Sequence, residues 1–253
     1  MTPALEARSI RKSFGGVTAL IDVSMVVAPG ETVGLIGPNG AGKTTLFDCL
    51  SGVQRPDGGR VSMAGRDVTH LPVHRRARLG LGRTFQRVEL FPGLTVRQHL
   101  LLAERVRTGE GGLWGDLRGQ GLASRSEQAT VEAMIGLVGL DGAADALVES
   151  LDLGHRRLVE LARALVGRPT VLLLDEPSSG LDHVETQAMV ATLDAVRRER
   201  GTAVVLVEHD LDMVTTVAER LYVLDHGVVI AHGEPERVFA EPGVRTAYLG
   251  ASA

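Results

Sequence analysis

The chain has 253 residues, of which 44% are hydrophobic, and its formal net charge is −4 at pH 7. This length suits one large α/β domain or two small ones, and the composition is that of an ordinary globular protein. The acidic balance gives no support to a general nucleic-acid role, which usually shows as a basic excess. No apolar run approaches the roughly 20 residues that cross a bilayer, and the first residues do not resemble a signal peptide. We therefore expect any function at a membrane to depend on a partner.

The beginning of the chain is predicted to be mainly β-structure. Residues 5–10 and 19–25 alternate like strands, and turns rich in glycine and proline separate them. This pattern favours an antiparallel β-layer that leads into the apolar strand 32–36. A further turn at 56–59 precedes a short strand at 60–63.

A glycine-rich loop follows the apolar strand. Residues 37–45 fit the phosphate-binding pattern GxxxxGK[ST] and precede a predicted helix at 46–50. Glycines let successive N–H groups point at phosphate oxygens, and the helix N-terminus adds positive potential. Lys43 is expected to reach the β- and γ-phosphates, and the Thr44 hydroxyl is expected to bind Mg²⁺. A turn without a ligand is the alternative, which the match at every constrained position disfavours. The residues expected to hold the nucleotide here are Gly37, Asn39, Gly40, Gly42, Lys43, Thr44 and Thr45.

The middle of the chain changes to helical spacing. This spacing runs from 96 to 164, interrupted by a glycine-rich stretch at 109–121 that we expect to be an exposed, mobile loop. Continuous apolar runs at 171–174 and 203–207 predict buried strands of a parallel sheet, with a helix at 186–200 between them. The remainder predicts a helix, a hairpin and a terminal helix. We expect a nucleotide-binding α/β core with a helical insertion.

Two adjacent carboxylates follow the predicted strand at 171–174. Ligands bind at the carboxyl ends of the strands in open α/β sheets. Asp175 is expected to hold Mg²⁺, directly or through water, and Glu176 to polarise the water that attacks the γ-phosphate. A solvated turn is the alternative, which the preceding phosphate-binding loop disfavours.

Four single residues carry less information by themselves. His209 follows the strand 203–207, where an imidazole can hydrogen-bond a γ-phosphate; a helix cap or a surface histidine is the alternative. Gln86 ends a predicted strand, and its amide could bind Mg²⁺ or orient water without adding charge. Phe14 could stack on adenine, or pack in the core or a turn. The single cysteine, Cys49, is expected to be buried in the core, and a reducing cytoplasm fits.

Taken together, these features resemble the ATP-binding subunit of ABC transporters. The motifs run in the family order of aromatic loop (Phe14), Walker A (37–45), Q-loop (Gln86), signature, Walker B (171–176), D-loop (179–182) and switch histidine (His209). The resemblance covers nearly the whole chain. It implies one domain over 1–253, with a P-loop NTPase α/β core at about 1–86 and 165–253. The N-terminal antiparallel β-layer belongs to this core, and a helical, signature-bearing insertion occupies about 87–164.

The resemblance also implies the chemistry and the assembly. The chain would bind ATP with Mg²⁺ and hydrolyse it, with catalysis by Glu176, His209 and Gln86. Thr44, Gln86 and Asp175 would ligate the metal. Two ATP-binding subunits would form a head-to-tail dimer that closes on ATP. Two membrane-spanning permease subunits would dock beside the Q-loop, which places the protein at the cytoplasmic face of the membrane.

Finer features are similar to the subfamily that energises branched-chain amino acid uptake. They are the segments 83–86, 89–96 and 247–250. This similarity implies import, with a solute-binding protein that delivers the solute. A subfamily that powers lipopolysaccharide extraction has a similar C-terminal ending and remains an alternative. An ATPase that acts on nucleic acid or ribosomes lacks support because there is no basic tract. A nucleotide sensor without turnover is disfavoured by the intact Lys43 and Glu176.

The segment that matches the family signature departs from its usual LSGGQ sequence. It reads Leu-Asp-Leu-Gly-His at 151–155, so Gly154 is kept, Asp152 replaces the serine and His155 replaces the glutamine. Two like unit charges about 4 Å apart cost on the order of 4 kcal/mol at an effective dielectric of 20. Arg156, Arg157 and a protonated His155 could offset part of this cost, or Asp152 could point away. Because a signature serves the partner's ATP, we expect a non-identical partner subunit. The alternative is that the subfamily tolerates varied residues at position 152.

Overall fold

The computed structural model describes residues 1–84, 90–108 and 123–249. Gln86 and the predicted loop at 109–121 lie outside the described residues. The strands are β1 (Leu5–Phe14), β2 (Val17–Val27), β3 (Thr32–Ile36), β4 (Gly58–Met63), β5 (Arg66–Asp67), β6 (Leu81–Arg83), β7 (Val171–Asp175), β8 (Ala203–Val207), β9 (Arg220–Asp225) and β10 (Val228–Gly233). The helices are α1 (Lys43–Ser51), α2 (Val73–Arg78), α3 (Val96–Thr108), α5 (Arg125–Leu137), α6 (Leu153–Val166), α7 (His183–Arg200), α8 (Leu211–Val217), α9 (Pro235–Ala240) and α10 (Pro242–Leu249), with 3₁₀ turns η1 (Asp141–Ala143) and η2 (Val148–Ser150).

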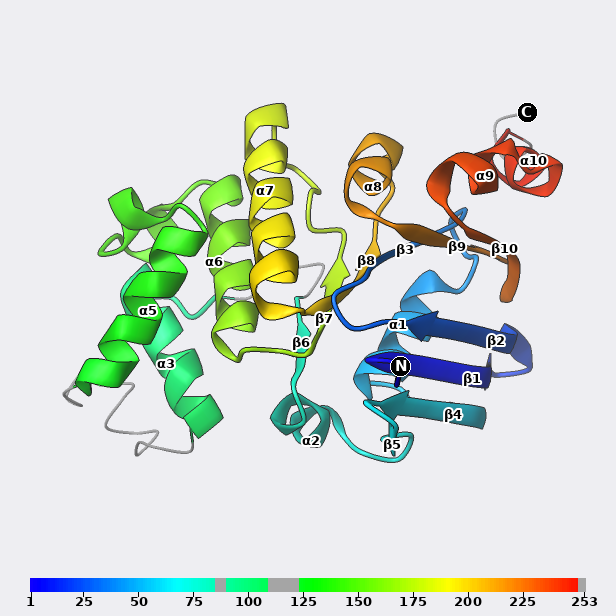
Figure 1. Cartoon of the computed structure of the whole chain (residues 1–253), viewed down its shortest axis with the longest axis horizontal. Coiled ribbons are helices and arrows are strands. Elements are labelled where there is room, and N and C mark those ends of the chain that lie inside the picture. The colour runs from blue at the N-terminus through cyan, green and yellow to red at the C-terminus, as the bar shows by residue number, and fades with distance from the viewer. Residues whose placement is uncertain (85–89, 109–122, 250–253) are drawn as a thin grey trace.

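Two sheets form the β-structure. The first is antiparallel, with the strand order β2-β1-β4-β5, and confirms the predicted N-terminal β-layer. The second has the order β10-β9-β3-β8-β7-β6; its strands are parallel except for β10, which pairs antiparallel with β9. Figure 1 shows the antiparallel sheet at one end of the molecule and helices α3, α5 and α6 at the other. The helical part enters the chain between β6, at the edge of the second sheet, and its neighbour β7.

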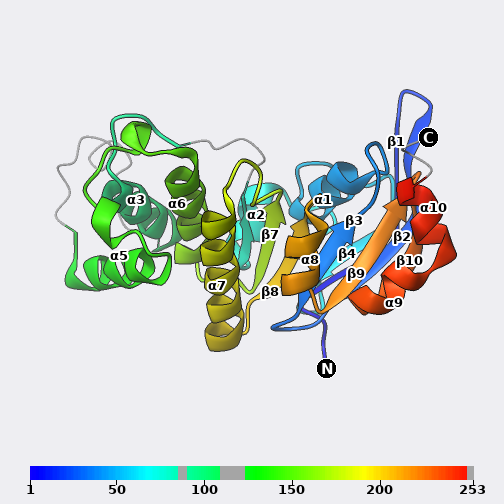
Figure 2. The same cartoon turned by 90° about the horizontal axis from the view of Figure 1, so that it is seen from above.

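The second sheet separates two hydrophobic cores. Successive side chains of a strand point to opposite faces, and in β8 the side chains of Val204 and Leu206 join one core while Val205 and Val207 join the other. The first core continues into α6, α7 and the helical part, and the second lies between the two sheets around α1. Figure 2 shows this order of layers from above. Burial on both faces explains why β3, β7 and β8 are continuous apolar runs.

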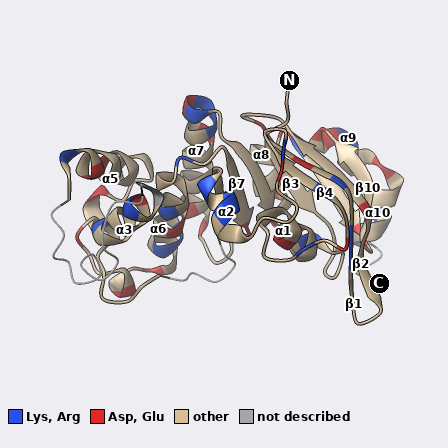
Figure 3. Ribbon diagram, turned by 90° about the horizontal axis from the view of Figure 1, so that it is seen from below, with Lys and Arg blue, Asp and Glu red and all other residues tan. Residues whose placement is uncertain are grey.

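Helix α1 lies between the two sheets and carries the single cysteine. Cys49 is fully buried in the second core, as the sequence predicted, and burial raises the pKa of its thiol to about 11. The C-terminal end of α1 is held by Arg76 of α2, a residue that is 1% exposed. It donates to the carbonyl oxygens of Cys49 at 2.8 Å and Leu50 at 2.6 Å, and also to those of Leu71 and Thr69. Figure 3 shows the basic residues grouped on α2, and Arg76 is the one that turns inward. A cation at a helix C-terminus complements the helix dipole, so this contact stabilises α1 at the end opposite the phosphate-binding loop.

Among the described residues, none of the helices combines the length and the apolar character that crossing a bilayer requires.

Candidate functional site

Three strands of the second sheet end side by side, and candidate residues follow each of them. In the register of the sheet, Leu35 of β3 and Asp175 of β7 both pair with Val207 of β8. Because these strands are parallel, the segments after them emerge at one edge of the sheet. Those segments are the phosphate-binding loop, the turn that begins at Glu176, and the loop that contains His209.

At two positions of the phosphate-binding loop the backbone passes so close to another segment of the chain that only glycine fits. A Cβ atom at Gly37 would lie 2.0 Å from the carbonyl oxygen of Leu224, and one at Gly42 would lie 2.6 Å from that of Ala19. Gly42, with φ of 104°, is also the N-cap of α1, and among the residues that the structure describes no side chain caps this helix. The N–H groups of its first turn are therefore free of side-chain acceptors, which is the arrangement that binds phosphate oxygens.

Lys43 is the first residue of α1 and turns back into the loop. Its ammonium donates to the carbonyl oxygens of Gly37 at 2.6 Å and Pro38 at 3.0 Å, and the side chain is 7% exposed. Burial lowers the pKa of Lys43, although the carboxylates of Glu176 and Asp175 act in the opposite direction. The ammonium of Lys43 therefore lies close enough to both carboxylates to interact with them, and the role of these residues as ligands of a metal-bound triphosphate stays a prediction.

Asp175 ends β7 in a buried position. Burial raises the pKa of its carboxyl group, and the guanidinium of Arg83, at 3.7 Å, acts in the opposite direction. Arg83 also donates to the side chains of Asp48 at 2.9 Å and Ser51 at 2.6 Å, both on α1. The hydroxyl of Thr84 accepts the N–H of Asp175 at 3.4 Å. The strand that leads toward Gln86 is therefore tied both to α1 and to Asp175, a connection that sequence reasoning missed.

Glu176 and His209 form a pair at the same edge. His209 Nε2 lies 3.0 Å from Glu176 Oε1. Glu176 has φ of 47°, a region that residues other than glycine rarely adopt, and its N–H donates to the carbonyl oxygen of Val207 at 2.8 Å. Such strain is held by surrounding contacts and often marks functional sites. The suggestion that His209 is a helix cap is wrong, because Asp210 caps α8 through the N–H groups of the first turn.

Phe14 and Gln86 are placed differently. Phe14 ends β1 and is 45% exposed, so it is not a core residue. The ammonium of Lys12 lies 5.2 Å from the centre of its ring. Stacking of adenine on Phe14 stays a prediction, and the role of Gln86 stays a prediction because that residue lies outside the described ranges.

The segment that departs from the family signature forms the N-terminus of α6. Asp152 is the N-cap: its carboxylate accepts the N–H of His155 at 2.8 Å and lies 2.7 Å from His155 Nδ1. These two contacts with His155 hold the pKa of Asp152 below its ordinary value. A Cβ atom at Gly154 would lie 1.8 Å from a carboxylate oxygen of Glu185, which belongs to the capping box of α7. A side chain at position 154 would therefore make the carboxylate of Glu185, the flexible end of its side chain, move aside.

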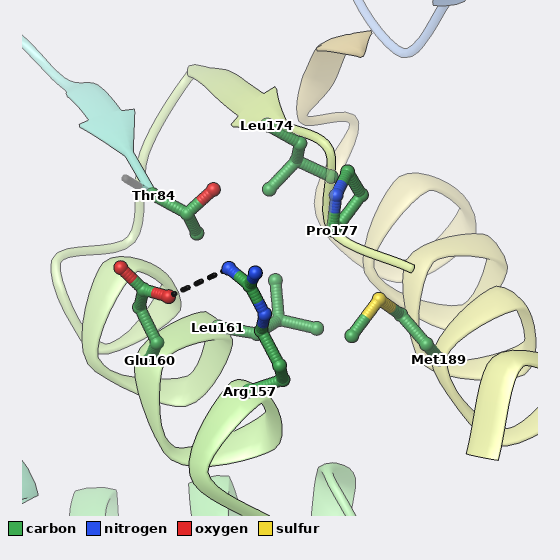
Figure 4. A pocket seen from close by; sticks show the side chains of 7 residues that line it. All are labelled: Thr84, Arg157, Glu160, Leu161, Leu174, Pro177 and Met189. Atoms are coloured by element: carbon green, nitrogen blue, oxygen red, sulfur yellow. Dashed lines mark ion pairs between the residues drawn. The ribbon is translucent and has the colours of Figure 1, made fainter. Parts of the chain in front are cut away.

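The arginine Arg157, which the sequence offered as a counter-charge for Asp152, points elsewhere. Arg157 is buried and pairs with Glu160 at 3.6 Å. The two residues line a small pocket between α6, α7 and the end of β7 (Figure 4). The other residues that line it are Thr84, Leu161, Leu174, Pro177 and Met189. Arg156 donates to the carbonyl oxygens of Leu151 and Glu149, at 2.8 Å each, and remains close enough to favour the charged form of Asp152.

Comparison with known proteins agrees with this geometry. Residues 20–179 match the profile of the family described as ABC transporter. The chain is 37% identical over 250 residues to the high-affinity branched-chain amino acid transport ATP-binding protein LivG of Escherichia coli (strain K12), which covers 98% of each chain. It is 36% identical, with the same coverage, to BraF of Pseudomonas aeruginosa, which bears the same description.

Two further similarities bear on function and fold. The chain is 37% identical over 253 residues to the lipopolysaccharide export system ATP-binding protein LptB of Acidithiobacillus ferridurans, which covers 99% of this chain and 98% of that one. Among solved structures, the ADP conformation of MJ1267, an ATP-binding cassette of an ABC transporter, has a TM-score of 0.85 and 30% identity. That similarity covers 99% of this chain and 100% of the other, and it confirms the predicted α/β fold class.

Proposed function

Because this chain belongs to the ABC transporter family of ATP-binding proteins, we propose that it binds and hydrolyses Mg²⁺-ATP as the energising subunit of an importer for branched-chain or related amino acids. The observation that carries the hydrolytic part is the pair formed by Glu176 and His209, 3.0 Å apart, in which Glu176 also interacts with Lys43. The amino-acid part is supported by the similarity to LivG and BraF.

The chemistry follows from the placement of the side chains. The uncapped N-terminus of α1 and the ammonium of Lys43 bind the phosphate oxygens. Glu176 accepts a proton from the attacking water, while His209 donates a hydrogen bond to Glu176 or to the γ-phosphate. Electrostatic stabilisation of the leaving phosphate and exact orientation of the water supply most of the rate in such reactions.

The residues at this edge fit Mg²⁺. Within the described ranges, no group of three or more histidine, cysteine, aspartate or glutamate side chains could hold a metal by itself. Magnesium commonly uses one or two protein oxygen ligands together with substrate phosphates and water. Asp175 and Thr44 are the described residues that would hold it, with Gln86 as a further ligand. When bound, the ion neutralises charge on the β- and γ-phosphates.

Replacement of Glu176 by Gln tests the hydrolytic proposal. The amide keeps the size of the side chain but cannot accept the proton, so turnover of ATP should fall by roughly 10²-fold or more while ATP binding persists. Glu199→Gln, on the exposed end of α7, is the matched control and should leave both quantities unchanged. Turnover that survives Glu176→Gln would show that another group acts as the base.

The proposal includes partners. Two ATP-binding subunits would form a head-to-tail dimer that closes on ATP, and two permease subunits would bind it at the cytoplasmic face of the membrane. A solute-binding protein would supply the solute from the other side. Transport of leucine by the reconstituted assembly, with energy from ATP, tests this arrangement. ATP-dependent movement of lipopolysaccharide without uptake of leucine would favour the export system that the similarity to LptB suggests.

We propose further that the second ATP-binding subunit is not identical to this one. The support is Asp152, whose low pKa keeps a negative charge at the N-terminus of α6, where the family places the partner's γ-phosphate. Asp152→Ser keeps a cap and removes the charge, so it should raise ATP turnover of the isolated chain if repulsion limits a homodimer. Equal turnover in both proteins would show that Asp152 is harmless and leave a homodimer as the simpler assembly.

A further inference from the structure

Glu208 stands between β8 and His209, and its carboxylate is almost completely buried. The side chain is 3% exposed. One oxygen, Oε1, accepts both the N–H of Ser178 at 2.8 Å and the hydroxyl of Ser178 at 2.7 Å. The other oxygen, Oε2, accepts the N–H of His209 at 3.1 Å. A single carboxylate therefore joins two loops that are 30 residues apart in the sequence.

A buried carboxylate is costly unless donors satisfy it. Within the part of the chain that the structure describes, the carboxylate of Glu208 accepts hydrogen bonds from two N–H groups and one hydroxyl. An amide in its place has one oxygen to accept with, so it can satisfy the donors of one loop only. The second oxygen of the carboxylate is what allows both loops to be held at once.

The two loops carry the two members of the pair at the catalytic edge. Ser178 lies two residues after Glu176, within a turn closed by the N–H of Ser179 and the carbonyl oxygen of Glu176 at 3.1 Å. His209 contacts Glu176 at 3.0 Å. Glu208 thus completes a ring of contacts that runs from Glu176 through Ser178 and back through His209. Since Glu176 sits at φ of 47°, its direction depends on the neighbours that hold this turn.

We propose that Glu208 is a positioning residue for ATP hydrolysis, which holds His209 and the turn after Glu176 in register with each other. The inference rests on the proposed hydrolytic function. Glu208 does not reach the substrate in this account; it acts through the backbone of the residues that do.

Turnover by Glu208→Gln tests the inference, measured as kcat and KM for Mg²⁺-ATP together with the thermal unfolding temperature. Whichever way the amide turns, its NH₂ group faces either the N–H of Ser178 or that of His209, so one of these N–H groups loses its acceptor and we expect the backbone around it to shift. A misplacement of about 1 Å can cost roughly 10²-fold, so we expect kcat to fall by roughly 10- to 100-fold while KM changes less than about threefold.

Glu127→Gln is the matched control. Glu127 is also a buried carboxylate, 6% exposed and bonded to Arg105 at 3.0 Å, but it lies in the helical part. Its replacement should lower the unfolding temperature without a selective loss of kcat. If both variants lose kcat in proportion to their loss of stability, Glu208 is a structural residue and the inference is overturned.

A double-mutant cycle with His209→Ala separates positioning from general damage. Because Glu208 is proposed to act through His209 and Glu176, Glu208→Gln should reduce kcat much less when the imidazole is already absent. An equal reduction in both backgrounds would overturn the inference. The wild-type chain is measured first: if it binds Mg²⁺-ATP and does not hydrolyse it with any partner, the proposed function fails. If the wild-type chain turns over and Glu208→Gln turns over equally fast, only this inference fails.

Discussion

The N-termini of helices α1 and α6 differ in whether a side chain caps them. Helix α1 begins at Gly42, and no side chain within the described ranges caps it, so its first N–H groups can donate to an anion. Helix α6 begins at Asp152, whose carboxylate already accepts the N–H of His155 at 2.8 Å. Both ends have the dipole that attracts negative charge, but only the first leaves that potential open to a ligand. At such an N-terminus, the presence of a cap therefore matters as much as the dipole for how many N–H groups an anion can reach.

The largest expected effect concerns the contact that holds α1 in place. At the C-terminal end of α1, Arg76 donates to the carbonyl oxygens of Cys49 and Leu50 and so helps to hold this helix. Arg76→Met leaves buried carbonyl oxygens without their donor, and we expect it to lower the free energy of unfolding by about 3 kcal/mol or more. The measurement is a denaturant titration. Arg75→Met, on the exposed side of the same helix, is the control, and equal midpoints for the two variants would contradict this account.

The next effect concerns the Mg²⁺-ATP that we expect to bind at the N-terminus of α1. Lys43→Met removes the ammonium that lies in the phosphate-binding loop. Hydrogen bonds to charged groups contribute about 1.5–3 kcal/mol, so Mg²⁺-ATP should bind roughly 10- to 100-fold more weakly. Calorimetric titration measures the dissociation constant, with the exposed Arg8→Met as a control. Unchanged affinity would mean that the ammonium does not contact the phosphates.

A smaller effect is expected at α6, the helix that Asp152 caps. Asp152→Ala removes the N-cap of α6, which typically costs about 1 kcal/mol of stability. Asp152→Ser should cost less, since serine caps nearly as well as aspartate. Unfolding in denaturant gives both values. A loss in the serine variant as large as that in the alanine variant would show that the charge, rather than the cap, stabilises α6.

The smallest effect is a dependence on pH. Since the folded pKa of Asp152 is below its ordinary value, its contribution to stability is complete above the unfolded pKa and is lost as the pH falls through the folded pKa. The difference in unfolding free energy between wild type and Asp152→Ser should therefore shift in favour of the variant as the pH drops below about 4. A difference that is constant with pH would show that Asp152 titrates alike in both states.

The comparison also explains what the sequence could predict. The phosphate-binding loop and the start of α1 were predictable because the residues that define them, from Gly37 to Thr44, are contiguous and each has a local role. The strands were predictable because burial on both faces leaves an unbroken apolar run, as in residues 171–174 of β7. At Asp152 the sequence suggested a charge facing the partner's phosphate; the structure adds that the same carboxylate serves its own helix.

Other residues were missed because their partners lie far away in the chain. Glu208 bonds Ser178, Arg83 bonds Asp48, and Arg76 bonds Cys49, across 30, 35 and 27 residues respectively. A charged residue beside a motif gives no sign of such contacts until the sheet register is known. In the structure, the burial of these charged side chains indicates that they have partners. The alternation of apolar and polar residues in the sequence does not show which charged residues are buried.

The burial of Cys49 has a practical consequence for measuring how two subunits approach each other. Thiol reagents attack the thiolate, and with a pKa of about 11 only about one molecule in ten thousand would carry it at neutral pH. The chain is therefore close to a thiol-free background as it stands. A cysteine introduced at Val184, which is 73% exposed near the start of α7, could carry a fluorescent probe alone. Distances between labelled subunits could then be followed through the ATP cycle without replacing any native residue of the core.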